Sequence, residues 1–192
     1  MARVVLYMSM SLDGFVTGPH DDATRPLGIG GERLHEWSGA EGVPASPLSL
    51  KVVEEIGAAG AVIAGRRTVE RFGGRVCPLH GGVAVFVPTR GALPGDPPAN
   101  VHFVPDGIAS CVTRAKTAAG DRDVVLHGAR IAQECLRAGL LDEMEIHLVP
   151  VVLGSGRRLF DGLEPERMDL TLDRALDAPG VTHLRYRVRY RR

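Results

Sequence analysis

This 192-residue sequence has few lysines, few aromatic residues and no excess of either charge. Lysine occurs only at Lys51 and Lys116, so almost all of the positive charge is arginine. Lys+Arg and Asp+Glu both total 23, which gives a formal net charge of zero at pH 7. Proteins that bind nucleic acid or anionic membranes usually carry an excess of positive charge. The balance therefore argues against both partners, and any anion-binding site must be local.

The three cysteines, Cys77, Cys111 and Cys135, are widely spaced along the chain. They lack the paired spacing that zinc sites and redox motifs need, so we expect reduced thiols. The seven histidines are scattered and form no HExxH motif or other ligand cluster. The sequence therefore predicts no metal site.

No apolar segment approaches the length of a membrane-spanning helix, and the N-terminus lacks a charged region followed by a long apolar run. We therefore expect no membrane partner and a cytoplasmic location. With 192 residues and 44% hydrophobic composition, the chain can bury a core as one domain over residues 1–192.

Apolar runs alternate with helix-like segments along the chain. Residue types and spacing predict strands over 3–10, 61–64, 83–87, 101–104 and 124–126, and helices over 46–57, 69–72, 106–119 and 131–140. In the helix that Ser46 caps, Leu50, Val53 and Ile56 are expected on one face. Another strand follows residue 140, and residues 168–176 and 181–190 flank a turn as an antiparallel hairpin. This order predicts an α/β fold with a mixed, mostly parallel sheet and helices on both faces.

Apolar and basic residues alternate along the last strand of this hairpin. They are Leu184, Tyr186 and Val188, and Arg185, Arg187 and Arg189. Interleaved basic and aromatic groups could form a nucleic-acid surface. Strict alternation, however, places the two kinds on opposite faces of a strand. It favours an edge hairpin with arginines in solvent and apolar residues inward.

A strand, a glycine and a helix follow one another around Gly128. Without a Cβ, Gly128 would let a ligand approach the backbone closely. The next amides open a helix, where unpaired N–H groups and the helix dipole favour an anion. One interpretation of this turn is a phosphate-binding site, and the other is ordinary packing of a strand against the helix that follows it.

Two further strand ends carry groups suited to phosphate. Gly65, Arg66, Arg67 and Thr68 follow one strand and open a helix, so two guanidiniums and a hydroxyl lie at its N-terminus. Thr89-Arg90 follows the next strand. A solvated basic turn would explain one such motif, but their recurrence favours an anion site.

The first strand ends at Ser11-Leu12-Asp13, followed by a glycine. Ligands of open α/β sheets bind near such strand ends, although Asp-Gly is also a favourable turn. Residues 18–41 are rich in glycine and polar residues and resemble a long loop, which contains Trp37. We expect the Trp37 ring either in the core or against a planar ligand.

Three segments of the sequence resemble the dihydrofolate reductase-like superfamily. They are SLDG at 11–14, GRRT at 65–68 and HGARIAQECLRAGLLDEMEIHLVPVVLGSGRRLF at 127–160. They are most similar to the branch containing the reductase domain of the bifunctional riboflavin-biosynthesis deaminase-reductase. The resemblance implies a three-layer α/β/α reductase, usually a homodimer, that binds NADPH along the carboxyl ends of the sheet. No cytidine-deaminase motif is present, so we do not expect the chain to be the bifunctional enzyme.

The resemblance also implies roles for the strand ends. Gly65, Arg66, Arg67 and Thr68 would hold the pyrophosphate and ribose phosphate, with Gly128, Ala129, Arg130 and Ile131 on the other side. Thr89 and Arg90 would lie by the adenosine 2′-phosphate. Many relatives carry Gly-Gly where this chain has His127-Gly128, so either the backbone approach is looser or the imidazole itself faces the cofactor.

The expected activity is NADPH-dependent transfer of hydride to a C=N or C=O group of a small pterin-like, pyrimidine-like or sugar-linked substrate. Ser11, Leu12 and Asp13 would border the nicotinamide and this substrate, and Trp37 would cover the pocket. Asp13 is the candidate for orienting the substrate or relaying a proton. The lone acid of true dihydrofolate reductases is not evident, although Glu54 and Glu55 lie on the nearest helix. A non-catalytic NADPH-binding dimer is the alternative.

Overall fold

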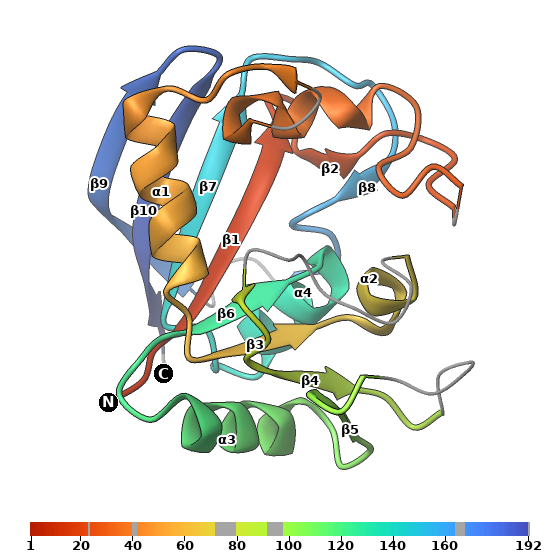
Figure 1. Ribbon diagram of the computed structural model, residues 1–192, viewed down its shortest axis with the longest axis vertical. Coiled ribbons are helices and arrows are strands. Elements are labelled where there is room, and N and C mark those ends of the chain that lie inside the picture. The colour runs from red at the N-terminus through yellow and green to blue at the C-terminus, as the bar shows by residue number, and fades with distance from the viewer. Residues whose placement is uncertain (23, 40–41, 72–79, 92–97, 164–167, 192) are drawn as a thin grey trace.

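An eight-stranded sheet runs through the chain in the order β5-β4-β3-β6-β1-β7-β10-β9 (Figure 1). The computed structural model describes residues 1–22, 24–39, 42–71, 80–91, 98–163 and 168–191. The strands are β1 (Val4–Ser11), β3 (Ala61–Ala64), β4 (Ala84–Pro88), β5 (Val101–Val104), β6 (Val124–His127), β7 (Glu143–Val149), β9 (Met168–Ala178) and β10 (Val181–Tyr190). The first six are parallel, and β10 and β9 are antiparallel. The predicted mixed, mostly parallel sheet with a C-terminal hairpin is confirmed.

Helices cover both faces of this sheet. They are α1 (Pro47–Gly57), α2 (Arg66–Arg71), α3 (Ile108–Ala119) and α4 (Ala129–Arg137), with the 3₁₀ helix η1 (Gly31–Ser38). Alternate residues of β1 divide the core. Val4 and Leu6 pack with α3 and α4, whereas Val5 and Tyr7 pack with α1 and η1. Figure 1 shows α1 in front of β1, β7 and β10, with α3 below β3 and β4.

The start of α1 agrees with its sequence signal, but its buried face agrees only in part. Ser46 Oγ accepts a hydrogen bond from the Ser49 backbone N–H at 3.1 Å, and Pro47 follows as the first helical residue. The helix buries Ser49, Val52 and Ile56, while Leu50 is 48% exposed. The prediction was therefore wrong for Leu50, whereas Ile56 is buried and Val53 packs against the core as expected. Burial of Ser49 is possible because its hydroxyl is paired with Ser46 Oγ at 3.0 Å.

The segment expected as a long loop contains regular structure. It includes η1, whose Leu34 and Trp37 are buried. Directly before this segment, the short strand β2 (Phe15–Thr17) pairs with β8 (Arg157–Arg158). A pairing this short and this distant in sequence has no local pattern. Asp106, the first residue of the helix predicted over 106–119, instead pairs with Arg114 at 3.0 Å, and Gly107 occupies the cap position of α3.

The remaining expectations concern cysteines, metals and membranes. Cys111 and Cys135 are buried and free, and Cys77 lies outside the described residues. Within the described ranges, no group of three or more potential ligands could hold a metal ion. No helix of the described chain is long and apolar enough to span a bilayer.

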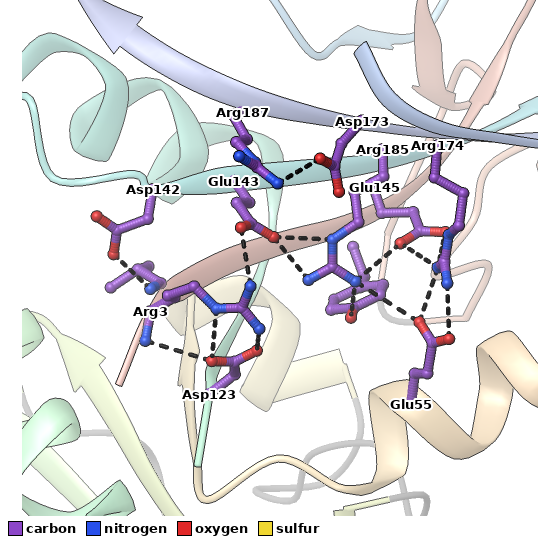
Figure 2. Close-up of polar contacts among 12 residues, drawn as sticks. Arg3, Glu55, Asp123, Asp142, Glu143, Glu145, Asp173, Arg174, Arg185 and Arg187 are labelled. Carbon is purple, nitrogen blue, oxygen red and sulfur yellow. Dashed lines mark hydrogen bonds and ion pairs between the residues drawn. The ribbon is translucent and has the colours of Figure 1, made fainter. Parts of the chain in front are cut away.

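A network of charged side chains lies on the α1 face of the sheet (Figure 2). The side chain of Arg185 on β10 is 11% exposed and bonds to Glu143 and Glu145 of β7. Glu145 is fully buried and accepts a further bond from Arg174 of β9 at 2.7 Å. Arg174 also pairs with Glu55 of α1 at 2.7 Å. The expectation of a solvent-facing arginine row was therefore wrong at Arg185.

Strand register explains this network. Arg185 lies opposite Glu145, and Arg187 lies opposite Glu143. Pairing neutralises charges that would otherwise be costly to bury. Arg187 is 58% exposed and pairs with Asp173, as the solvent-facing prediction expected. The network therefore ties α1, β7 and the C-terminal hairpin together.

Candidate functional site

The predicted strand-end residues gather at one edge of the sheet. Because β4, β3, β6 and β1 are adjacent and parallel, their carboxyl ends all lie at this edge. These ends carry Thr89, Gly65, Gly128 and Ser11. Open α/β sheets bind ligands at this edge. The structure thus brings together segments that are far apart in sequence.

The turns after β3 and β6 contact each other directly. The backbone N–H of Gly65 donates to the carbonyl of His127 at 3.3 Å. Gly128 has φ +104°, and a Cβ there would lie 3.2 Å from Thr68 Oγ1. A Cβ on Gly65 would lie 3.2 Å from Cγ1 of Ile131. Both turns therefore depend on glycine, for backbone conformation at Gly128 and for close approach at both.

The helix after Gly128 begins directly at this contact. Ala129 is the first residue of α4, and the Ala132 N–H closes the first turn onto the Gly128 carbonyl at 3.0 Å. No side chain caps this N-terminus. Its unpaired amides and the helix dipole thus favour an anion beside the two glycine turns.

The basic side chains predicted to bind phosphate belong to the segments that follow β3, β4 and β6. Arg66 pairs with Glu70 at 2.6 Å, and its guanidinium reaches the loop after β4, where a Cβ on Gly91 would lie 2.6 Å from Nη1. Arg67 and Arg90 are exposed. Arg130 is 85% exposed and pairs with Glu134 at 3.2 Å. These arginines can therefore turn toward an anion without disturbing the core.

The hydroxyl of Thr89 is used within its own turn. Thr89 Oγ1 lies 3.3 Å from both the N–H and the carbonyl oxygen of Gly91. This contact holds the loop after β4 beside Arg66.

His127 ends β6 and lies half-buried beside Gly128. Its Nε2 lies 2.7 Å from Nε2 of His80, a residue that is 2% exposed. Burial, helped by His80 and His35, lowers the pKa of His127 to about 3. The ring is therefore neutral at pH 7. No local sequence pattern singles out His80, because 46 residues separate it from its partner His127.

Asp13 at the end of β1 is held by three hydrogen bonds. Its carboxylate accepts from Ser11 Oγ at 2.6 Å and from the backbone N–H groups of Leu153 and Gly154 at 3.1 and 2.7 Å. These bonds, the one from Ser11 first, lower its pKa to about 2. An ionised carboxylate accepts hydrogen bonds but cannot donate a proton at neutral pH. The described contacts give Asp13 the role of fixing the loop after β7.

Ser11 and Leu12 differ in their access to a ligand. Ser11 is fully buried, and its hydroxyl also accepts the Phe15 N–H at 2.9 Å. Leu12 is 64% exposed, and Val152 beside it is 69% exposed. Leu12 therefore offers apolar surface at the mouth of β1, whereas Ser11 supports the turn.

Trp37 packs in the core rather than over an open pocket. The residue is 7% exposed, and its indole N–H donates to Ser9 Oγ at 2.9 Å. Its ring contacts those of His147 and His183, with centroids 4.4 and 4.8 Å away. The two imidazoles share a 2.9 Å contact between their Nδ1 atoms. Of the two positions expected for the Trp37 ring, the structure shows the one in the core. Trp37 therefore does not form the exposed cover of a pocket that the resemblance implied.

The carboxylates of α1 are also accounted for. Glu54 is exposed, and Glu55 is bound to Arg174, which lowers its pKa. Neither is a buried, unpaired acid like the one that a reductase could use to protonate its substrate.

The assembled edge fits an anionic dinucleotide. Two glycine turns bring backbone into contact, a helix begins there without a side-chain cap, and exposed arginines occur in the same strand-end segments. Backbone amides and arginines are the groups that bind phosphates in proteins. Exposed Leu12 adds an apolar surface that a ring could contact.

Residues 107–184 match the family model of the RibD C-terminal domain. A comparison with curated protein sequences gave no match. Over these residues, the match confirms the resemblance to the reductase-domain branch. It covers β6, α4 and β7, which include the Gly128 turn.

Solved structures share the fold over nearly the whole chain. A protein from Shewanella sp. PV-4, described as a riboflavin biosynthesis protein, has a TM-score of 0.73 and 20% identity, with 98% of this chain and 99% of that one covered. A pyrimidine reductase-like protein from Corynebacterium diphtheriae has a TM-score of 0.65 and 14% identity, with coverage of 99% and 93%.

A third structure is a larger protein. It is a diaminohydroxyphosphoribosylaminopyrimidine deaminase/5-amino-6-(5-phosphoribosylamino)uracil reductase from Thermotoga maritima, with a TM-score of 0.65 and 16% identity. The alignment covers 97% of this chain but only 56% of that protein. At these identities, the three comparisons establish a common dihydrofolate reductase-like fold.

Proposed function

We propose that this protein is an NADPH-dependent reductase acting on a C=N or C=O group of a small pyrimidine-like, pterin-like or sugar-linked substrate. The observation that carries the proposal is the contact between the Gly65 and Gly128 turns, with α4 beginning at that point. The match of residues 107–184 to the RibD C-terminal domain supports it.

NADPH would be held by the residues around these turns. Gly65 to Thr68 and Gly128 to Ile131 would bind the pyrophosphate through backbone amides and the Thr68 hydroxyl. Arg66, Arg67 and Arg90 would surround the 2′-phosphate, for which a guanidinium is the suitable partner. When bound, NADPH supplies the hydride, and the protein supplies position and electrostatics.

The first substrate to test follows from the Thermotoga maritima relative, which is named a 5-amino-6-(5-phosphoribosylamino)uracil reductase. We extend this compound to the present chain as part of the proposal. Leu12 would contact the reacting rings through its exposed side chain. Asp13 would act by holding Leu153 and Gly154 in place, so that the loop after β7 borders the substrate.

The proposal includes a cytoplasmic homodimer with a small-molecule substrate and no nucleic-acid partner. Two features support the dimer: the family resemblance and the exposed leucines of β9. Exclusion of nucleic acid rests on the zero net charge and on the burial of Arg185 among carboxylates.

Titration with NADPH and NADH, followed by thermal unfolding and calorimetry, tests the cofactor. Ligand at about a hundredfold its dissociation constant should stabilise the fold by roughly 2.7 kcal/mol. We expect NADPH to bind at least tenfold more tightly than NADH, because one charge-assisted hydrogen bond contributes about 1.5–3 kcal/mol. Arg90→Gln should narrow the difference in affinity between NADPH and NADH. Arg114→Gln, which changes an exposed side chain of α3, should leave that difference unchanged. Equal affinities would refute the assigned 2′-phosphate contacts, and no shift at millimolar cofactor would refute the reductase.

A non-catalytic NADPH-binding dimer is the second candidate. It is favoured by the engagement of Asp13, which leaves the predicted proton relay without a free carboxylate. Steady oxidation of NADPH with 5-amino-6-(5-phosphoribosylamino)uracil would exclude it. Tight NADPH binding without oxidation across a panel of pterins, pyrimidines and carbonyl compounds would support it.

A further inference from the structure

Two histidines from distant segments form a pair beside the Gly128 turn. Nε2 of His80 and Nε2 of His127 lie 2.7 Å apart, which is hydrogen-bond distance. His80 is 2% exposed. Its other ring nitrogen, Nδ1, is buried and makes no hydrogen bond of ordinary geometry in the described structure, although the Ile56 backbone acts on the ring as a hydrogen-bonding group. His127 is half-buried and immediately precedes Gly128. A buried, incompletely bonded imidazole at a predicted binding site requires an explanation.

The pair cannot be doubly protonated and keep its hydrogen bond. One Nε2 has to donate and the other has to accept, so the two rings cannot both be cationic. Burial lowers the pKa of both histidines. His35 of η1 is the third titratable group that acts on His127, and burial lowers its pKa too. No carboxylate contributes to holding a proton on His127.

The shared hydrogen bond couples the outer nitrogens of the two rings. A neutral imidazole carries one proton, so the ring that donates through Nε2 has a bare Nδ1. The ring that accepts through Nε2 carries its proton on Nδ1. His127 Nδ1 can therefore offer a donor or an acceptor, and His80 takes the complementary tautomer. Neither arrangement places a net charge beside Gly128.

We propose that His127 contacts an uncharged amide-type group of the bound ligand, and that His80 is the positioning residue that sets its ring orientation and tautomer. This inference rests on the proposed cofactor and substrate. Phosphates are matched by the α4 amides and the arginines, whereas a neutral imidazole matches a group with N–H and C=O. The nicotinamide carboxamide and a pyrimidine ring amide share this chemistry.

Binding measurements with three probes separate these two sources. The probes are NADP⁺, 2′-phospho-ADP-ribose, which lacks nicotinamide, and 5-amino-6-(5-phosphoribosylamino)uracil, each titrated calorimetrically against wild type and His127→Gln. A carboxamide contact predicts about three- to tenfold weaker NADP⁺ binding with unchanged 2′-phospho-ADP-ribose binding. A pyrimidine contact predicts weaker binding of the uracil compound alone.

Variants of His80 test the positioning role. His80→Leu removes the partner of His127 and should weaken the same probe, whereas His80→Gln retains a polar partner and should restore part of the affinity. Two-bond ¹⁵N–¹H spectra of the wild-type imidazoles provide a readout that does not depend on a variant folding. Addition of that probe should change the ring nitrogens of both His127 and His80. A merely structural pair would not respond.

Two other histidines serve as controls. His183 belongs to the second buried pair, with His147, and lies away from Gly128 on β10. His102 is exposed on β5. His183→Gln and His102→Gln should leave the affinity for all three probes unchanged.

The possible failures are distinct. If wild type binds neither nucleotide, the proposed cofactor and the carboxamide contact are wrong, and the titration with the uracil compound alone decides the histidine role. If wild type binds the probes and His127→Gln binds each of them with the affinity of wild type, only the histidine role is wrong. Ring nitrogens of His127 that stay unchanged with every bound probe would also overturn it.

Discussion

At the scale of single residues, burial decides the charge of the histidines. Burial lowers the pKa of His127 to about 3 and that of His183 to about 4, and it holds the pKa of His147 well below its ordinary value. The same chemical group would be half-protonated near pH 6.5 in an unfolded chain. Neutral imidazoles can pair through N–H···N bonds, as both histidine pairs do here.

These shifts predict an acid-sensitive fold. Between pH 6.5 and 4, His183 binds a proton in the unfolded chain but not in the folded protein. The free energy of unfolding should therefore decrease as the pH is lowered through this range. For His183 alone the full loss is on the order of 3 kcal/mol. Urea unfolding from pH 7 to 5 should show a shallower pH slope in His183→Gln than in wild type. His102→Gln is the control, and identical slopes in all three proteins would contradict the prediction.

At the scale of elements, alternation on β7 and β10 assembles a buried ionic network. The carboxylates of Glu143 and Glu145 face the α1 side of the sheet. The antiparallel register places Arg185 opposite Glu145, and its guanidinium pairs with both carboxylates. Arg174 extends the network to Glu55 on α1 (Figure 2). These ion pairs connect α1 and the β9–β10 hairpin to β7. The Arg185 side chain is mostly buried because it takes part in them, whereas Arg187 pairs with Asp173 and remains exposed.

Substitution of Arg185 should therefore be far more costly than substitution of its neighbour. Arg185→Met leaves two buried carboxylates without their shared cation and should lower the free energy of unfolding by roughly 3 kcal/mol. Arg187→Met removes an exposed pair on the same strand and should cost about 0–1 kcal/mol. Urea unfolding at pH 7 measures both. Equal losses would show that burial of Arg185 is energetically unimportant.

At the scale of the whole molecule, the sheet ends in an edge strand with exposed apolar residues. Leu170 and Leu172 of β9 are 45% and 53% exposed. They lie opposite Val188 and Tyr186 of β10. Exposed edge strands are sites of association between chains, and clustered apolar residues strengthen that tendency. The proposed homodimer would bury this surface.

The dimer proposal predicts a selective effect of charge on β9. Leu172→Lys should shift the protein from dimer to monomer at micromolar concentration, as measured by size-exclusion chromatography with light scattering. Leu50→Lys is the matched control, because Leu50 is 48% exposed on α1, on the other face of the sheet. A wild-type monomer would contradict the homodimer itself. A Leu172→Lys dimer would exclude β9 as its interface.

The sequence by itself determined the elements and the chemistry available at their ends. Apolar runs located the strands, and Ser46-Pro47 located the start of α1. The glycines after β3 and β6 indicated close backbone approach, which the structure shows at Gly65 and Gly128. These features were predictable because they depend on hydrogen bonds and steric limits within a few neighbouring residues.

Tertiary structure alone decided which side chains share an environment. The pairing of His80 with His127, the burial of Arg185 and the core position of Trp37 all join segments distant in sequence. The alternation of residues along β10 could not show that β7 lies beside it and places Glu143 and Glu145 next to Arg185. Likewise, Asp13 was visible as a turn acid, but its bonds to Leu153 and Gly154 exist only because β1 and β7 are neighbours. Desolvation and long-range pairing depend on the assembled sheet, so no local pattern encodes them.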